Sequence, residues 1–292
     1  MAFHQTPKIV LGTAQFGLDY GVSNMAGQVA VSDVRAILSL AADHGISMLD
    51  TAAAYGNSEE CLGNVGTAKF GLVSKLTGTP EQLSQSGAVR RQFEQSLKRL
   101  KCVNLRGYLV HDPALLLDPI SGDQIFQQLT ELRSAGLVEK IGASVYTPDE
   151  ARILSERYDL DLLQLPVNPL DGRWSEVGPE LKQKGVEIHC RSIFLQGLLL
   201  MPLAALPKHM HRHEPILAAW HQGCVDAGIT PLQACVEFVK TTTFIDFSVL
   251  GVTTKAELAQ IIEAFDLQQL HNKISFPHTC DETFLNPSLW AL

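Results

Sequence analysis

Basic residues are in the minority in this chain, and like charges do not occur in runs. Lysine and arginine together number 23 against 31 acidic residues, so the formal net charge is −8. Nucleic acids and anionic membranes bind clustered basic surfaces, because such surfaces release counterions or attract lipid head groups. The composition therefore predicts neither partner and suits a small neutral or cationic molecule better.

Cysteine is scarce, and long apolar runs are missing. The six cysteines are widely separated and show no CxxC spacing, which argues against zinc modules and thioredoxin motifs. No window is long and apolar enough to span a bilayer, and the first residues lack the basic and apolar segments of a secretory signal. We therefore expect reduced thiols and a cytoplasmic protein.

Hydrophobic residues make up 46% of the 292 residues, enough for a large core. Short apolar runs, typical of buried strands, lie at 8–14, 47–52, 70–76, 105–111, 139–145, 161–168, 187–194 and 247–252. Helical patterns follow them at 31–45, 57–66, 87–100, 122–136, 147–158, 178–185, 214–240 and 253–265. Eight such units without a linker predict one α/β domain over residues 1–292, an (α/β)8 TIM barrel with its active site at the C-terminal ends of the strands.

Single residues mark where several helices begin and end. Ser32 and Thr147 are expected N-caps, since a hydroxyl can accept a hydrogen bond from the first helical turn. Gly45, Gly136 and Gly185 are expected to end helices, because glycine readily adopts the left-handed backbone conformation.

Four polar residues stand where apolar runs end. Asp50 closes SMLD, Tyr55 lies just beyond it, Lys75 closes GLVSK and His111 closes GYLVH. Because a barrel of parallel strands gathers these ends on one face, the four side chains are expected to meet in one pocket. Taken singly they have plainer interpretations: a helix cap for Asp50, packing for Tyr55, and a turn for His111.

Together the four suit the protonation of an oxygen that gains negative charge. A phenol has a pKa of about 10, and an ammonium about 4 Å away supplies roughly 4 kcal/mol at an effective dielectric near 20. Lys75 is therefore expected to make Tyr55 a competent acid, while Asp50 keeps Lys75 charged. His111 can orient a carbonyl or relay a proton. Reduction of a carbonyl by hydride is such a reaction.

Segments across nearly the whole chain resemble the aldo-keto reductase family, including its bacterial members. They are LGTAQFGLDYG, GISMLDTAAAYGNSEECLG, LVSK, LVHDP, GAS and QLPVNPLD, in that order. The resemblance implies an NAD or NADP cofactor and a catalytic tetrad of Asp50, Tyr55, Lys75 and His111, with Tyr55 as general acid and with Tyr55 and His111 at the substrate. It also accounts for the absence of GxGxxG, which a Rossmann domain needs.

The same resemblance implies which residues hold the cofactor. They are Gly12, Thr13, Asp50, Ser144, Gln164, Arg191, Ser192, Phe194, Gln196, Gly251, Val252, Thr253, Thr254, Lys255 and Glu257. The sequence departs from the family at two of these places. Val145 replaces an asparagine that contacts the carboxamide, and Arg191 replaces an aromatic ring that stacks on the nicotinamide, so the charge of Arg191 is expected to influence the affinity for the oxidised ring.

Nucleotide preference is expected to depend on Glu257. Members of the family that prefer NADP place an arginine near this position, and a carboxylate beside a phosphate is repulsive. Lys255 can compensate from a nearby turn, so the sequence favours NAD(H) or the use of both nucleotides.

Two segments fall outside the repeating pattern. Residues 200–215 and the tail 268–292 are expected to form loops over the mouth of the barrel, with Trp174 and the tail lining the substrate pocket. His209, His211 and His213 alternate and would share one side of an extended segment. A solvated loop is the interpretation adopted, and no metal site is predicted.

The sequence thus predicts an oxidoreductase that interconverts a small aldehyde or ketone, possibly sugar-like, and its alcohol. Two alternatives remain. One is a nucleotide-sensing or partner-binding barrel with little turnover, and the other is an NAD-dependent sugar dehydrogenase that works in the oxidative direction.

Overall fold

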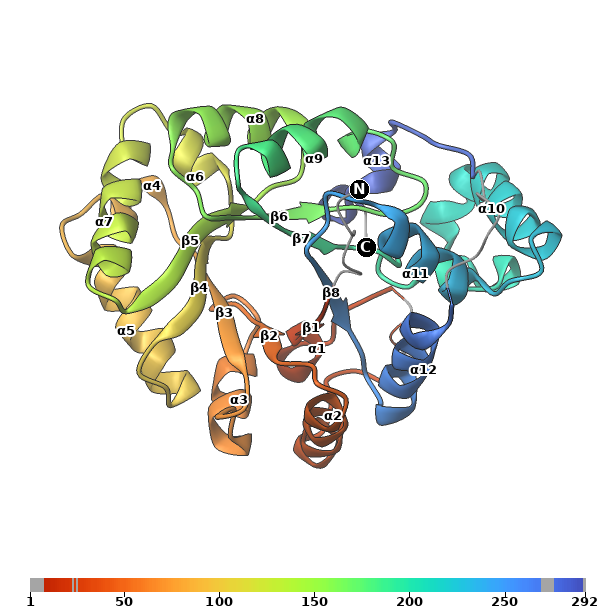
Figure 1. Cartoon of the computed structure of the whole chain (residues 1–292), viewed down its shortest axis with the longest axis horizontal. Coiled ribbons are helices and arrows are strands. Elements are labelled where there is room, and N and C mark those ends of the chain that lie inside the picture. Colours follow the sequence, from red (N-terminus) through yellow and green to blue (C-terminus); the bar gives the residue numbers. More distant parts are fainter. Residues whose placement is uncertain (1–7, 23, 25, 269–275, 291–292) are drawn as a thin grey trace.

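Eight parallel strands close into a barrel in the computed structural model of the chain, which describes residues 8–22, 24, 26–268 and 276–290. The strands follow one another around the barrel in chain order (Figure 1). They are β1 (Lys8–Gly12), β2 (Met48–Asp50), β3 (Gly71–Leu76), β4 (Leu105–Val110), β5 (Val138–Ser144), β6 (Leu162–Pro166), β7 (Glu187–Arg191) and β8 (Phe247–Gly251). The predicted fold is confirmed.

Helices surround the strands on the outside (Figure 1). The longer ones are α2 (Val31–Asp43), α3 (Ser58–Val65), α5 (Ala88–Leu100), α7 (Gly122–Ser134), α8 (Pro148–Arg157), α9 (Trp174–Gln183), α10 (Glu214–Asp226), α11 (Pro231–Thr241) and α12 (Lys255–Asp266). Short helices are α1 (Ala14–Gly17), α4 (Pro80–Leu83), α6 (Ala114–Leu117) and α13 (Glu282–Leu285), and 3-10 turns are η1 (Leu198–Leu200), η2 (Leu203–Ala205), η3 (Lys208–His213) and η4 (Pro287–Leu289). In the described part of the chain, no helix has both the length and the apolar character needed to cross a bilayer.

Alternation along the strands decides which side chains reach the mouth of the barrel. A small apolar cluster, made only of strand residues, fills the interior: Val10, Met48, Val73, Leu109 and Leu162. Since strand side chains alternate with a period of two, the next inward position on each strand lies one layer higher. These positions hold Gly12, Asp50, Lys75, His111 and Gln164. The apolar layer therefore closes the barrel from below, and the layer above it faces the mouth.

The helix boundaries follow local chemistry in most cases. Thr147 caps α8 and forms a capping box with Glu150, as predicted. Gly45, Gly136 and Gly185 adopt φ values of 74°, 69° and 82°, so they end helices as expected. The prediction for Ser32 was wrong: α2 begins at Val31 after an extended Ala30, and no side chain caps it.

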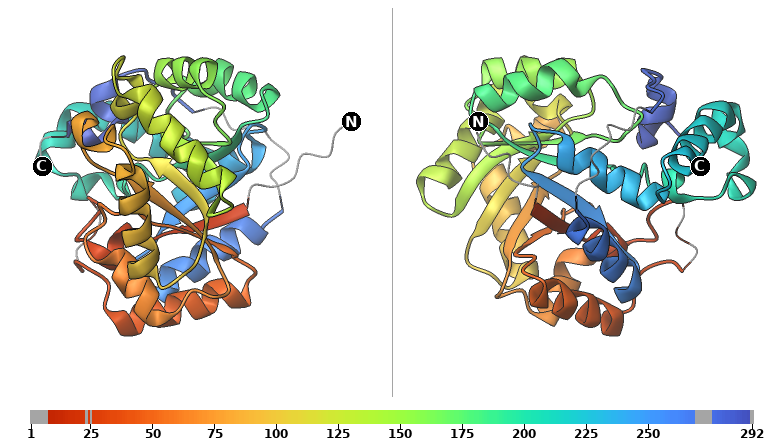
Figure 2. Two further views of the ribbon diagram at one scale, coloured as in Figure 1. Left: turned by 90° about the vertical axis from the view of Figure 1, so that its left-hand side faces the viewer. Right: turned by 45° about the vertical axis from the view of Figure 1, so that its right-hand side comes forward.

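An additional segment between β7 and α11 lies to one side of the ring of helices, in cyan in Figures 1 and 2. It runs from η1 to α10, and these two elements are joined by Trp220, which has no exposed surface and donates to the carbonyl of Leu199 at 2.9 Å. Within it, η3 is helical, so the three alternate histidines of 209–213 do not share one face as they would in an extended segment. Among the described residues, no three His, Cys, Asp or Glu side chains gather closely enough to hold a metal ion.

Candidate active site

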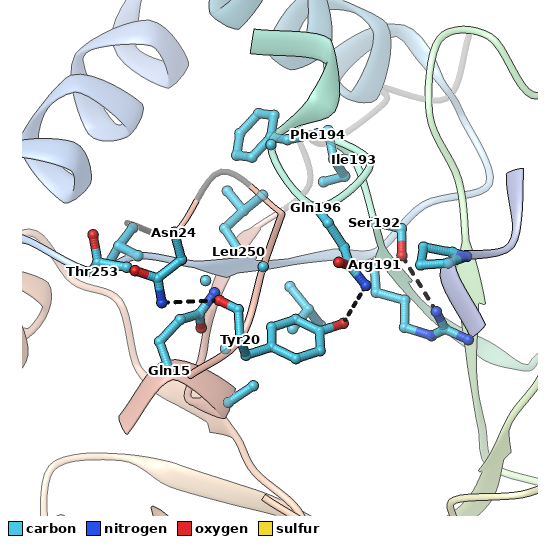
Figure 3. Close-up of a pocket in the computed structure, with 18 of the residues that line it drawn as sticks. Gln15, Tyr20, Asn24, Arg191, Ser192, Ile193, Phe194, Gln196, Leu250 and Thr253 are labelled. Carbon is cyan, nitrogen blue, oxygen red and sulfur yellow. Dashed lines mark hydrogen bonds between the residues drawn. The ribbon is translucent and has the colours of Figure 1, made fainter. Parts of the chain in front are cut away.

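A cavity of about 1050 Å³ opens at the C-terminal ends of the strands. At one end it is lined by Tyr55 and His111, and at the other by Thr253, Thr254 and Glu257 beside the start of α12. Figure 3 shows part of its wall, which is built from the loops after β1, β7 and β8. The cavity is elongated enough to reach from the predicted tetrad to the first turn of a helix.

The predicted tetrad comes together at the first of these ends. The ammonium of Lys75, which has no exposed surface, donates to Asp50 at 2.5 Å and to the carbonyl of Thr51 at 3.0 Å. It also lies 3.4 Å from the phenolic oxygen of Tyr55. The ring of His111 meets that of Tyr55 edge to face, with centroids 5.6 Å apart. Four side chains from the ends of three strands, β2, β3 and β4, therefore form one continuous group.

Burial controls the protonation of two members. Burial and, to a smaller extent, the nearby charge of Lys75 together lower the pKa of His111 to about 4. His111 is therefore a neutral hydrogen-bonding group at neutral pH. Burial also raises the pKa of Tyr55, and the carboxylate of Asp50 adds to the increase. Tyr55 therefore stays protonated at neutral pH, and the expectation that Lys75 makes it a competent acid stays a prediction.

Two glycines fix the turn that carries Tyr55. A Cβ on Gly17 would lie 1.9 Å from the carbonyl oxygen of Tyr55, and a Cβ on Gly56 would lie 2.2 Å from the carbonyl oxygen of Gly17. Gly56 also has a φ of 53°, which side chains disfavour. Beside them, the hydroxyl of buried Ser58 donates to the carbonyl of Thr13 at 2.8 Å. Main-chain contact between α1 and this turn thus sets the position of the phenol.

The ends of β5, β6 and β7 supply a second polar group. Ser144 and Gln164 are neighbours in register across β5 and β6, and the Gln164 amide donates to the free oxygen of Asp50 at 2.8 Å. From β7, Arg191 donates through Nε to the hydroxyl of Ser144 at 3.3 Å. The predicted carboxamide ligands are therefore connected both to the tetrad and to Arg191.

The loop after β7 turns sharply beside the cavity. Ser192, Leu195 and Gln196 have φ values of 61°, 47° and 53°, a left-handed conformation that non-glycine residues rarely adopt and that is frequent at functional sites. The side chains of Gln196 and Tyr20, from the loop after β1, point toward each other across this part of the cavity (Figure 3). The two loops thereby form a wall over its middle.

The first turn of α12 carries its own carboxylate. Glu257 accepts a hydrogen bond from the main-chain nitrogen of Thr253 at 2.7 Å and another from its hydroxyl at 2.9 Å. Thr254 caps the helix by accepting from the nitrogen of Glu257. Lys255 is exposed and lies outside the cavity lining. The first turn of α12 therefore adds a carboxylate to the cavity lining beside the main-chain groups of the helix end.

Most other predicted residues also line the cavity: Gly12, Thr13, Phe194, Gly251 and Val252. Trp174 does not, because it is 1% exposed and packs in the core at the start of α9. In the tail, Pro287 and Trp290 line the cavity, whereas 269–275 and 291–292 lie outside the described residues.

Sequence reasoning missed two tyrosines, Tyr20 and Tyr146, that line the cavity. The signal for Tyr146 was its place just after the fifth strand, and the signal for Tyr20 was its place in the LGTAQFGLDYG segment.

The donor set fits a nicotinamide dinucleotide. Ser144 and Gln164 offer the hydroxyl and amide groups that a carboxamide requires, close to the tetrad. Gly251 lies on the cavity wall, where a Cβ would approach the side chain of Gln15 to 2.6 Å. The cavity continues past it to the N-terminus of α12, a position that favours phosphate.

Comparisons with known proteins agree with one another. The family model described as "Aldo/keto reductase family" matches residues 8–274. Protein tas of Escherichia coli is 27% identical over 92% of this chain and 94% of its own length. Oxidoreductase sirO of Leptosphaeria maculans is 28% identical over 70% of this chain, which spans 65% of that protein. The NADH-specific methylglyoxal reductase of Escherichia coli is 28% identical over 53% of this chain and 54% of its own length.

Solved structures share the barrel. The holo form of aldo-keto reductase AKR11C1 from Bacillus halodurans has a TM-score of 0.74 at 17% identity, covering 91% of this chain and 88% of its own. The glycerol dehydrogenase AKR11B4 from Gluconobacter oxydans has a TM-score of 0.70 at 20% identity, covering 92% of both chains.

Proposed function

The chain belongs to the aldo/keto reductase family, and we propose that it is an NAD(P)(H)-dependent oxidoreductase that interconverts an aldehyde or ketone and its alcohol. The observation that supports this most directly is the contact of a protonated phenol, Tyr55, with the buried ammonium of Lys75 at a cavity wall. This pair provides a proton and a means of stabilising the anion that remains.

Each member of the tetrad has a separate task in this proposal. The nicotinamide, when bound, supplies a hydride to the carbonyl carbon. Tyr55 protonates the carbonyl oxygen as it gains charge, and Lys75 stabilises the phenolate that results. Asp50 keeps Lys75 charged and oriented, while neutral His111 donates a hydrogen bond that orients the carbonyl. The raised pKa of Tyr55 keeps its proton in place until the oxygen becomes strongly basic.

The nucleotide in this proposal is NADH rather than NADPH. Glu257 places a carboxylate at the far end of the cavity, and its bonds to Thr253 already use donors that a ribose phosphate would need. Lys255 is exposed and is not part of the cavity lining, so the proposal gives it no share in offsetting this charge. The NADH-specific relative is consistent with this choice.

The proposed substrate is a small oxygen-rich carbonyl compound, such as a short sugar or a related aldehyde. Among the related proteins, one is named for methylglyoxal and another for glycerol, both small and polar. The polar groups of Tyr55 and His111 at this end of the cavity suit a carbonyl with neighbouring hydroxyl groups. A cytoplasmic location remains a prediction from the thiol content.

One experiment tests this function against both alternatives. The purified protein is incubated with NADH or NADPH and a panel of aldehydes, ketones and ketoses, and with NAD⁺ or NADP⁺ and the corresponding alcohols. Absorbance of the reduced nucleotide reports turnover. Reduction of a carbonyl supports the proposal, turnover only with alcohols supports the dehydrogenase, and nucleotide binding without turnover supports the sensing barrel.

A further inference from the structure

Arg191 is the only permanent cation among the described residues that line the cavity. Lys75 lies behind the wall and is neutralised by Asp50. No carboxylate within the described ranges lies within ion-pair distance of Arg191, and its guanidinium donates hydrogen bonds to neutral oxygen atoms. The end of the cavity near the tetrad therefore carries one uncompensated positive charge.

The guanidinium of Arg191 is held in a fixed orientation. It donates to the hydroxyl groups of Ser144 and Ser192, each at 3.3 Å, and to the carbonyl of Val145 at 3.1 Å. Figure 3 shows its bond to Ser192. The ring of Tyr146 covers it at 4.4 Å. Because its nitrogen atoms and one face are already engaged, the group has a planar surface left for a flat ligand.

The same arginine shares Ser144 with the proposed carboxamide site, so it lies beside the site proposed for the nicotinamide. In the proposed reaction the carbonyl carbon gains a hydride and its oxygen gains the proton of Tyr55. The carbonyl is reduced by two electrons, and the dinucleotide is oxidised by two electrons and acquires one positive charge on its ring. That charge would arise near the guanidinium of Arg191, which forms no ion pair with any carboxylate in the described part of the chain.

We propose that Arg191 makes this site distinguish the two redox states of the nicotinamide, binding the neutral reduced ring more tightly than the cationic oxidised ring. This inference rests on the proposed function and deepens it. The protein would retain NADH and release NAD⁺. It could therefore work as a reductase even where NAD⁺ is present in excess over NADH. By linkage, each tenfold difference in affinity raises the reduction potential of the bound couple by about 30 mV.

The test compares dissociation constants rather than activity. NADH and NAD⁺ are titrated into the wild type, Arg191→Gln and Arg191→Lys by calorimetry, and the ratio of the NAD⁺ constant to the NADH constant is determined. We expect Arg191→Gln to lower this ratio at least tenfold, and Arg191→Lys to retain most of it because the charge is kept. Arg35→Gln, which removes an exposed arginine of α2 far from the lining, is the matched control and should leave the ratio unchanged.

Several outcomes would overturn the inference. An equal ratio in the wild type and Arg191→Gln would do so, and so would an equal weakening of both nucleotides, which is expected if Arg191 grips the pyrophosphate. A raised KM for an acidic carbonyl with an unchanged ratio would assign Arg191 to the substrate instead. If Arg191→Gln does not fold, the reduction potential of the nucleotide bound to the wild type is measured instead. A value equal to that of the free nucleotide would also overturn the inference. If the wild type reduces carbonyls but the ratio of dissociation constants is the same in Arg191→Gln, only this inference is refuted. If the wild type binds no nucleotide, the proposed function is refuted as well.

Discussion

The amide of Gln196 donates a hydrogen bond of 3.3 Å to the phenolic oxygen of Tyr20, joining the loops after β7 and β1 across the cavity wall. A nucleotide lying beneath these loops would leave faster if they separated more easily. Because one hydrogen bond contributes about 1 kcal/mol, we expect Tyr20→Phe to raise the dissociation rate of NADH by up to about fivefold. Stopped-flow fluorescence measures this rate. An unchanged rate would show that the contact does not retain the nucleotide.

Removal of the phenolic hydroxyl should separate chemistry from binding. We expect Tyr55→Phe to lower kcat at least 100-fold, since general acids typically contribute that much or more, while the dissociation constant for NADH changes less than threefold. Turnover and calorimetry measure the two quantities. Tyr158→Phe, whose hydroxyl bonds to the carbonyl of Leu116 away from the cavity, is the control. Full activity in Tyr55→Phe would remove it as the proton donor.

Lys75 should affect both turnover and stability. Lys75→Met leaves Asp50 buried without its cation, so we expect kcat to fall at least 100-fold and the free energy of unfolding to fall by about 3–5 kcal/mol. Urea denaturation measures the stability. The double variant Asp50→Asn with Lys75→Met removes both charges and should regain part of the loss. If the free energy of unfolding of the double variant falls by the sum of the decreases in Asp50→Asn and Lys75→Met, the two residues are not coupled.

The carboxylate of Glu257 should control the choice of nucleotide. We expect Glu257→Arg to raise the ratio of kcat/KM for NADPH to that for NADH at least tenfold, because a repulsive charge becomes attractive. Glu263→Arg makes the same change of charge on the same helix, at an exposed position outside the cavity lining, and should leave the ratio within twofold. Equal effects of both variants would place the ribose phosphate elsewhere.

His111 should make the fold sensitive to mild acid. Its pKa of about 4 lies below the value of about 6.5 in an unfolded chain, so the unfolded state binds the proton more readily. The contribution of neutral His111 to stability is complete above pH about 6.5 and is lost as the pH falls toward 4, by up to about 1.4 kcal/mol per pH unit. Urea denaturation from pH 7 to pH 4.5 should show a steeper loss for the wild type than for His111→Asn. Parallel curves would contradict the assignment.

Periodicity was sufficient to predict the barrel and the meeting of three of the four tetrad residues. Asp50, Lys75 and His111 each stand two residues after a buried apolar residue of the barrel interior, so a period of two places them together at the mouth. Trp174 escaped the same reasoning because the sequence interpretation began its helix at 178. With the true start, Trp174, Val177 and Leu181 share the buried face of α9.

Side-chain contacts between strand ends that are far apart in the chain could not be predicted from the sequence. The bond between Gln164 and Asp50 joins residues 114 positions apart, and the bond of Arg191 to Ser144 joins two strand ends that are not adjacent in the chain. Such bonds depend on strand tilt and side-chain rotamers, which the pattern of apolar residues does not determine. The burial that raises the pKa of Tyr55 could not be predicted for a related reason, since the degree of burial depends on the whole surrounding structure.

The two glycines beneath the phenol also matter for how this protein is compared with others. The position of the Tyr55 side chain depends on close main-chain contacts at Gly17 and Gly56. Neither glycine has a group that could take part in a reaction. A homologue that kept all four tetrad residues but carried alanine at position 17 would look competent when only its reactive groups are inspected. Its tyrosine would nevertheless be pushed away from the carbonyl by a single methyl group.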